Sequence, residues 1–219
     1  MKTDMQLRRD VEAELDWDQR FDASDIGVAV KDAVVTLTGK VTSYAERNAV
    51  EEATQAVAGV RAIANEIEID LHDSAKRDDA ELAADALFSL KSHILVPVDD
   101  IKVIVRSGWI TLEGEVSLRF QADAAAKAVQ NLWGVRGVIN NIGLKVPPLT
   151  TTTDVKAKIE EAFRRHAQLD ADTIRVSLDD GTLILSGEVH TLRERNDAEA
   201  AAWAAPGVTK VDNRIHVHP

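Results

Sequence analysis

The sequence predicts an α+β fold built from three tandem copies of one small domain, each with the order helix, strand, strand, helix, strand. The first reason is a recurring glycine: Gly39, Gly114 and Gly187 are each followed 20 residues later by Gly-Val and 26 residues later by Asn. A fixed internal period of this kind is typical of repeated structural units. The second reason is the hydrophobic pattern, which changes in every copy from four-residue spacing to alternation. The copies align without gaps over residues 7–69, 82–144 and 155–217.

The first element of each copy is predicted to be a helix. In the first copy Leu7, Val11 and Leu15 recur every four residues, which places them on one buried stripe of a helix. The other copies carry apolar residues at the matching positions, so we expect the same helix in each. Those positions are 82, 86 and 90 in the second copy and 155, 159 and 163 in the third.

Two strands joined by a tight turn are predicted next. Apolar residues alternate from Ile26, which indicates a strand with one buried face. Ser-Gly at 107–108 and Asp-Gly at 180–181 are hairpin turns, but the first copy has Ala33 in place of glycine. A positive φ angle costs Ala more than Gly, so this turn is expected to differ in shape. We expect one strand order throughout and equal burial of Ile26, Ile101 and Ile174.

A second helix and a third strand complete each copy. Ser43 and Glu46 have the spacing of a capping box at the start of a helix, and Thr191 and Glu194 repeat it. The second copy lacks this pair, and there Ser117 is expected to cap one residue earlier. The recurring Gly-Val pair ends the helix, because Gly is favoured just past a helix C-terminus. The third strand then starts at the recurring Asn.

The predicted domain bounds are residues 1–70, 78–146 and 151–219, called copy 1, copy 2 and copy 3 below. The linker at 70–81 is highly charged, so it is either flexible or partly an early start of the next helix. The linker at 145–154 contains two adjacent prolines, which favour an extended, semi-rigid spacer.

The composition limits the classes of partner and of chemistry. Lys and Arg number 26 against 37 Asp and Glu, a net charge of −11, so nucleic acid is not an expected partner. The chain has no cysteine, which excludes disulfides and thiolate sites. No apolar run reaches the ~18 residues of a membrane span, and the N-terminal stretch does not look like a signal peptide. We therefore expect a cytoplasmic protein, or a periplasmic one if a signal peptide has been removed.

The repeated pattern resembles the BON domain family (bacterial OsmY and nodulation). The residues that carry the resemblance have identical counterparts in all copies, among them Leu37, Gly39, Val41, Asn65 and Ile67. The resemblance implies two helices packed on one face of a three-stranded mixed sheet. It also implies a non-enzymatic binding or scaffolding role in osmotic or envelope stress, with phospholipid surfaces or other proteins as partners. A cytosolic relative that binds potassium makes a soluble, ion-responsive role the alternative.

No catalytic residues, metal site or cofactor are predicted. No nucleophile, base and orienting group recur together, and no phosphate-binding or dinucleotide motif is present. His216 and His218 lie on one face of the last predicted strand, but two ligands without a third make a weak metal site. His93 and His166 share the position at the end of the first helix, where a cation is favourable.

Four aromatic residues stand where the other copies have small or polar residues, so the fold itself does not require them. Trp203 replaces glutamine, and Trp17 replaces serine or arginine. Exposed large apolar side chains often mark contacts. These contacts are either with a partner or between neighbouring domains of the same chain. The other two such residues are Phe88 and Phe120.

A basic patch on the first helix of copy 3 is the predicted contact with anionic phospholipid, with Trp203 and Trp17 as further candidate contacts. Residues 1–72 carry 8 basic and 15 acidic side chains, residues 73–148 carry 9 and 10, and residues 149–219 carry 9 and 12. Only the later copies are therefore expected to face an anionic surface. Replacing both Lys158 and Arg165 with Glu is expected to abolish lipid binding. The predicted patch consists of Lys156, Lys158, Arg164 and Arg165.

Overall fold

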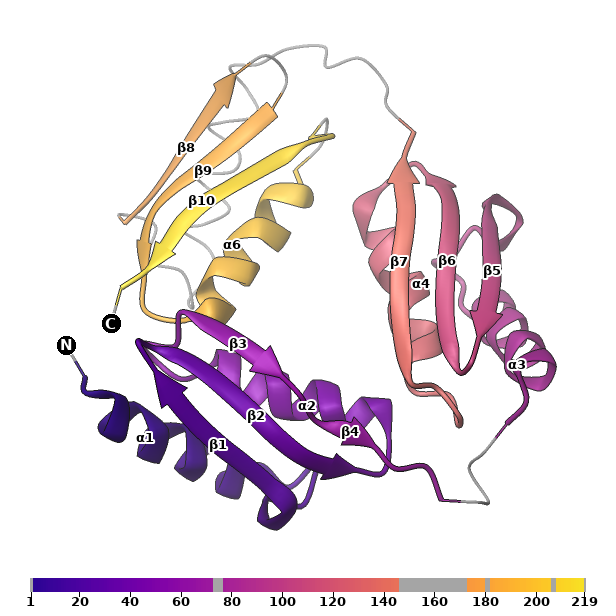
Figure 1. The fold of residues 1–219 in the computed structure, drawn as a ribbon. Helices are drawn as coiled ribbons and strands as arrows, with labels where there is room; N and C mark the ends of the chain where they lie inside the picture. The colour runs from indigo at the N-terminus through magenta and orange to yellow at the C-terminus, as the bar shows by residue number, and fades with distance from the viewer. Residues whose placement is uncertain (1, 73–76, 146–172, 180–181, 206–207, 219) are drawn as a thin grey trace. The chain divides into compact units, whose positions relative to one another are not determined.

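The computed structural model describes residues 2–72, 77–145, 173–179, 182–205 and 208–218 (Figure 1). Within them lie three mixed sheets, one for each copy of the repeat, and helices that follow the predicted order. The fold class is therefore α+β, as the sequence predicts. The first helix predicted for copy 3 lies outside the described residues.

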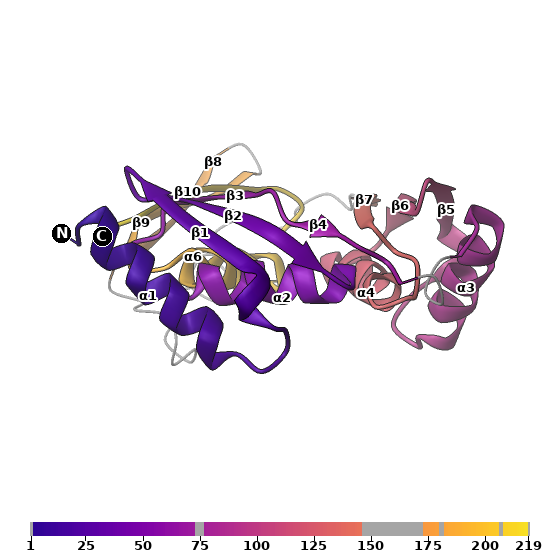
Figure 2. The same cartoon turned by 60° about the horizontal axis from the view of Figure 1, so that its bottom comes forward.

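Copy 1 consists of two helices and a small mixed sheet. The central strand β2 pairs antiparallel with β1 and parallel with β3 and β4. The last two strands are pieces of the single predicted third strand, since both pair with β2 in one register. Both helices lie on the same side of this sheet (Figure 2). The elements are α1 (Asp4–Trp17), β1 (Ile26–Lys31), β2 (Val34–Val41), α2 (Tyr44–Gln55), β3 (Ala62–Asn65) and β4 (Glu68–Ile69).

Copies 2 and 3 have the same strand order as copy 1. In each, the second strand is central, with an antiparallel partner before it and a parallel partner after it. The prediction of one strand order is confirmed. In copy 2 the elements are α3 (Asp79–Ser92), β5 (Ile101–Arg106), β6 (Trp109–Val116), α4 (Arg119–Gln130) and β7 (Gly137–Leu144); in copy 3 they are β8 (Ile174–Asp179), β9 (Thr182–Val189), α6 (Leu192–Trp203) and β10 (Val211–Val217).

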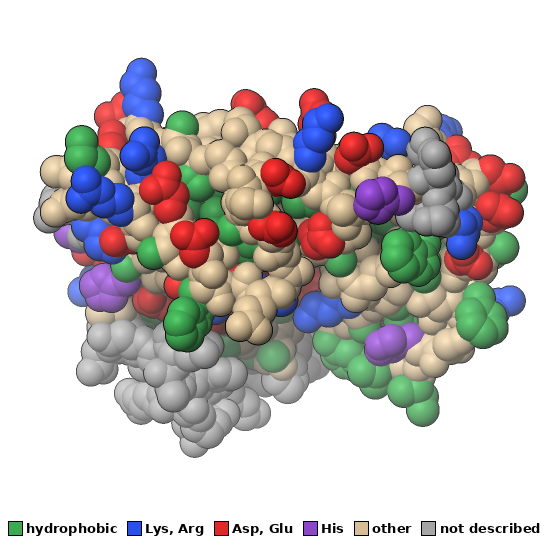
Figure 3. Space-filling model, turned by 90° about the horizontal axis from the view of Figure 1, so that it is seen from below, with side chains coloured by type: hydrophobic (Ala, Val, Ile, Leu, Met, Phe, Trp, Pro, Cys, Tyr) green, Lys and Arg blue, Asp and Glu red, His purple; other side chains and the backbone are tan. Residues whose placement is uncertain are grey.

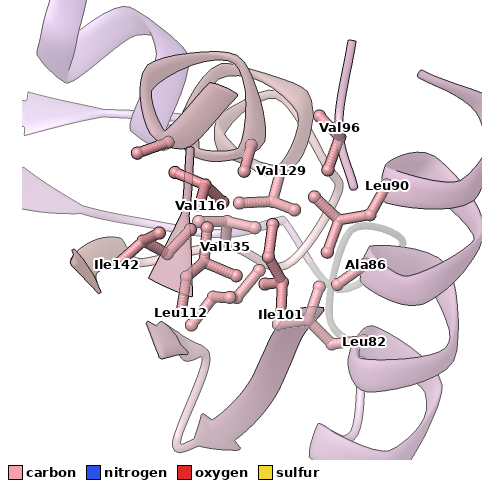
Figure 4. Packing of buried hydrophobic residues seen from close by; sticks show 13 residues of the cluster. Leu82, Ala86, Leu90, Val96, Ile101, Leu112, Val116, Val129, Val135 and Ile142 are labelled. Carbon is pink, nitrogen blue, oxygen red and sulfur yellow. The ribbon is translucent and has the colours of Figure 1, made fainter. Parts of the chain in front are cut away.

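The core of copy 2 lies between its helices and one face of its sheet. The predicted stripe of α3 points into this core and meets strand and α4 side chains there (Figure 4). The sheet contributes its central strand through Leu112 and its neighbours through Ile101 and Ile142. Because these side chains are aliphatic and closely packed, they hold both helices on one face. The stripe comprises Leu82, Ala86 and Leu90, each with no exposed surface.

The recurring glycine at the end of the hairpin has a backbone that side chains rarely adopt. The φ angles are 124° at Gly39, 144° at Gly114 and 135° at Gly187. A Cβ atom at any of them would overlap the carbonyl oxygen of the residue just before the first strand, which is Asp100 in copy 2. The glycine thus lets the second strand pass close to the start of the first.

The recurring asparagine fastens the third strand to the second helix. In copy 3 the Asn213 amide donates to the Glu199 carboxylate at 3.0 Å, and its oxygen accepts the Ile215 backbone N–H at 3.1 Å. In copy 2 Asn140 donates to the Ala122 carbonyl oxygen of α4 at 2.9 Å. The bond from Ile215 satisfies a backbone N–H group of an edge strand, and the other two bonds join the third strand to the second helix.

Three local predictions need correction. Ile26 is only half-buried, whereas Ile101 and Ile174 are 7% and 4% exposed, so burial at this position is unequal. The turn at Ala33 is not different in shape, because two-residue hairpins with positive φ occur in both copy 1 and copy 2. In both, an aspartate on the first helix accepts the two turn N–H groups: Asp4 in copy 1 and Asp79 in copy 2.

Ser117 does not cap α4, which is the third correction. Leu118 occupies the N-cap position, and the amide oxygen of Gln121 accepts the backbone N–H groups of Ser117 and Leu118, both at 3.1 Å. The predicted pairs do cap the other copies: the Glu46 N–H donates to Ser43 Oγ, and the Glu194 N–H donates to Thr191 Oγ1. Gln121 thus takes the place of Glu46 and Glu194, which accept the backbone N–H groups of Thr42 and His190 in the other copies. The N–H of Gln121 donates to the Leu118 carbonyl oxygen instead of to a hydroxyl.

We expect Ala33→Gly to stabilise copy 1. Ala33 has a φ of 63°, which costs an L-residue about 1–2 kcal/mol, and Gly removes that cost while raising the entropy of the unfolded chain. The net gain in free energy of unfolding should be about 0.5–1 kcal/mol, measured by urea denaturation. Gly108→Ala in copy 2 is the converse variant and should destabilise, because its Cβ would lie 3.0 Å from the Gly134 carbonyl oxygen. A loss of stability in Ala33→Gly would contradict the strain argument.

Candidate functional site: an apolar surface on copy 2

Copy 2 exposes a group of large apolar side chains on the outer side of its helices. Ile94 is 97% exposed, Phe88 is 74% exposed and Leu95 is 50% exposed. Figure 3 shows hydrophobic side chains gathered on copy 2, on the right of that view. We name this group the copy 2 apolar surface, and define it as Leu87, Phe88, Ile94, Leu95 and Phe120.

The periodicity of α3 explains why these side chains face outward. Leu82, Ala86 and Leu90 fill the inward stripe, so Phe88 lies on the opposite side of a helix with 3.6 residues per turn and Leu87 lies beside the stripe. The helix ends at Ser92, and His93 is its C-cap. The chain then has to turn towards β5, and this loop carries Ile94 and Leu95 outward while Val96 enters the core.

The other copies show that the fold does not require these apolar residues. In copy 1 the positions of Leu87, Phe88, Ile94, Leu95 and Phe120 are taken by small or polar residues. Copy 3 has small or polar residues at all five positions as well. Apolar groups that are exposed, and dispensable for folding, are expected at a contact surface. The copy 1 residues are Glu12, Ala13, Gln19, Arg20 and Ala45, in the same order.

Copy 1 has a charged network at the same place. The Asp18 carboxylate accepts hydrogen bonds from the Arg20 guanidinium at 2.8–3.1 Å, and Arg20 also pairs with Glu52 of α2 at 2.7 Å. The hydrogen bonds from Arg20 hold the pKa of Asp18 below its ordinary value, and those same acceptors raise the pKa of Arg20. The helix end of copy 1 therefore carries an internally paired charge network that copy 2 lacks, although Trp17 is exposed beside it.

An open depression of about 570 Å³ lies beside this network. The side chain of Asp22 accepts the Ser24 backbone N–H at 3.0 Å, which lowers the pKa of Asp22. The wall is acidic, but no cluster of three or more potential metal ligands occurs in the part of the chain that the structure describes. The depression has no further polar feature that identifies a ligand. Its lining residues are Leu15, Asp16, Asp18, Gln19, Phe21, Asp22, Ala23 and Ser24.

The predicted contact residues have different surroundings. Trp17 is 82% exposed on the last turn of α1. Trp203 is half-buried at the end of α6, and its indole N–H donates to Glu199 at 3.4 Å. The basic residues predicted to contact lipid lie outside the described residues, and their role stays a prediction. They are Lys156, Lys158, Arg164 and Arg165.

Sequence reasoning found Phe88 and Phe120 but missed the aliphatic members of the copy 2 apolar surface. The signal in the sequence is the same as for the aromatic residues, because Ile94 and Leu95 stand where copy 1 has the polar residues Gln19 and Arg20.

The histidines fit their predicted places. His93 caps the end of α3, as the sequence indicates, and His166 lies outside the described residues. His216 and His218 are both exposed, and their positions two residues apart place them on one side of the last strand. The absence of a metal site stays a prediction.

Comparison with known proteins decides the family. The model of the BON domain matches residues 3–70, 78–145 and 151–219. The chain belongs to the BON domain family. Among curated BON relatives, the osmotically-inducible protein Y of Escherichia coli (strain K12) is 27% identical over 151 residues, which cover 63% of this chain and 72% of that protein.

Among solved structures, the C-terminal domain of CdsD, a structural protein of the type III secretion system of Chlamydia trachomatis, matches over the whole of both chains. The identity is 14% and the TM-score is 0.26, which is too low to show a shared fold. Across the described segments of this BON chain, no helix is both long and apolar enough to cross a membrane.

Proposed function

We propose that this chain is a non-enzymatic binding protein of a bacterial osmotic or envelope stress response, and that it associates peripherally with anionic phospholipid. Membership in the BON family and the likeness to an osmotically-inducible protein support the stress-related role. The single observation that supports a binding role most strongly is the copy 2 apolar surface, which is exposed and absent from the other copies.

The shape and size of this surface favour a weak, reversible association. Its side chains project from the outside of a helix and from a loop, so they can enter the headgroup region of a bilayer without unfolding the domain. The whole chain carries a net charge of −11, which an anionic membrane repels. We therefore expect local attraction with modest affinity, in the manner of a peripheral protein.

We expect the full chain to sediment with vesicles of phosphatidylglycerol and phosphatidylcholine at low salt, and to be released in part at high salt. Salt screens the attraction between basic side chains and anionic headgroups, but leaves apolar insertion in place. The measurement is the bound fraction in co-sedimentation at two salt concentrations, with phosphatidylcholine vesicles as the control. An absence of binding to both kinds of vesicle would contradict the proposed function and favour a protein or ion partner instead.

The same co-sedimentation assay also tests the basic patch predicted for copy 3. The double change Lys158→Glu with Arg165→Glu should reduce the low-salt bound fraction if copy 3 also faces the membrane. The alternative function, that of a soluble protein that responds to potassium, predicts no vesicle binding by any variant. The two cellular locations expected from the sequence, and the three domain bounds, stay predictions.

A further inference from the structure

The C-terminal end of the first helix differs between copy 1 (α1) and copy 2 (α3) in charge as well as in hydrophobicity. In copy 1 four carboxylates surround this end: two on α1, one just after it, and one on α2. In copy 2 the same four positions hold an apolar residue, a histidine and two lysines. The acids of copy 1 are Glu12, Asp16, Asp18 and Glu52, and their counterparts in copy 2 are Leu87, Lys91, His93 and Lys127.

The copy 1 ion pair shows that two of these positions meet in space. Arg20 and Glu52 are 2.7 Å apart, although one follows α1 and the other lies on α2. Copy 2 has the same fold, and its equivalent positions hold Leu95 and Lys127. An internal ion pair is thus replaced by an exposed apolar side chain beside a lysine, and both lysines of this region are exposed.

From this we infer that copy 2 is the membrane-docking copy, with the copy 2 apolar surface entering the headgroup layer while Lys91 and Lys127 face lipid phosphates. The inference rests on the proposed lipid association and adds its location. Copy 1, which has carboxylates at the equivalent end, is the copy that an anionic bilayer repels. Copies 1 and 2 are therefore not equivalent in lipid binding.

The charges around the copy 2 apolar surface favour an anionic lipid surface as its partner. A patch made only of Phe, Ile and Leu would suit many apolar partners, but the two lysines that stand where copy 1 has Asp16 and Glu52 point to an anionic one, although Asp85 and Asp123 lie on the same helices. The apolar groups project from the helices and from the loop after α3, which suits insertion between headgroups. The combination of a lysine and large apolar side chains is the composition expected of interfacial segments.

The test uses the full chain and vesicles of phosphatidylglycerol with phosphatidylcholine. The apolar variant Phe88→Ala, Ile94→Gln, Leu95→Gln installs residue types that copies 1 and 3 have at these positions. It should bind at least tenfold more weakly at both low and high salt. The charge variant Lys91→Asp, Lys127→Glu installs the copy 1 residues and should bind more weakly at low salt, with little change at high salt.

The matched control is Met5→Ala, which removes a 63% exposed apolar side chain from copy 1 and installs the residue of copy 2, Ala80. It should bind vesicles as the unmodified chain does. All variants alter exposed side chains, so their thermal unfolding should match that of the unmodified chain.

Four outcomes separate the inference from the proposed function. Weak binding by the apolar variant and unchanged binding by Met5→Ala support docking through copy 2. Undiminished binding by the apolar variant overturns the inference while leaving lipid association intact, as does an equal loss in Met5→Ala. Failure of the unmodified chain to bind any vesicle overturns the proposed function and the inference with it.

Discussion

Gly114→Ala is expected to unfold copy 2 under conditions in which the other copies stay folded. The φ of 144° is one that an alanine adopts only under strain, and its Cβ would overlap the Asp100 carbonyl oxygen. Since the obstacle is backbone at the start of β5, it cannot move without breaking the pairing of β5 with β6. We expect a loss of about 3–5 kcal/mol in the free energy of unfolding.

The measurement is urea unfolding of the full chain followed by circular dichroism, with a separate early transition as the expected result. Gly143→Ala is the matched control on the neighbouring strand β7. Its Cβ would have only ordinary contacts, the nearest at 3.7 Å, and should change stability by less than about 1 kcal/mol. Equal stability of the two variants would show that the recurring glycine has no special backbone role.

Asn213→Ala is expected to destabilise copy 3 by about 2 kcal/mol. The change removes the amide that bonds to Glu199 of α6, and it leaves the Ile215 N–H on the edge strand without its side-chain acceptor. A half-buried group that loses its partner costs about 1–3 kcal/mol.

Asn213→Asp should cost at least as much as Asn213→Ala. It keeps the acceptor for Ile215, but it places a carboxylate against that of Glu199. Denaturant unfolding measures both, and His216→Ala, at an exposed position on the same strand, serves as the neutral control. If Asn213→Asp were as stable as the native chain, the hydrogen bond from Asn213 to Glu199 would not contribute to the stability of copy 3.

The repeat explains how much of the fold could be predicted. The stripe of Leu82, Ala86 and Leu90 and the alternation from Ile101 are set by burial, and the sequence repeats both patterns in each copy. The glycine and asparagine positions were recognisable as structural, but their partners were not. The contact of Gly114 with the Asp100 carbonyl depends on how the strands pack, and the bond from Asn213 to Glu199 depends on how strand and helix pack. Neither contact can be predicted from a local pattern.

The local errors have a similar origin. Ala33 was expected to alter its turn, but Asp4 binds both turn N–H groups from the first helix and holds the same hairpin geometry. This contact joins residues that are 28 and 29 positions apart, so no local pattern indicates it. The contact surface was predicted in part, through Phe88, because exposure of Ile94 depends on where the loop turns after α3.

Docking of copy 2 on anionic lipid is tested most directly by a fluorophore that reports the polarity around single positions. The chain has no cysteine, so Ile94→Cys and Gln19→Cys each provide one labelling site, at equivalent positions of copy 2 and copy 1. With vesicles of phosphatidylglycerol and phosphatidylcholine, an environment-sensitive label at position 94 should shift to the blue, and the label at position 19 should keep its emission in water. A blue shift at position 19 alone, or none at position 94 while the chain is bound, would contradict docking through copy 2.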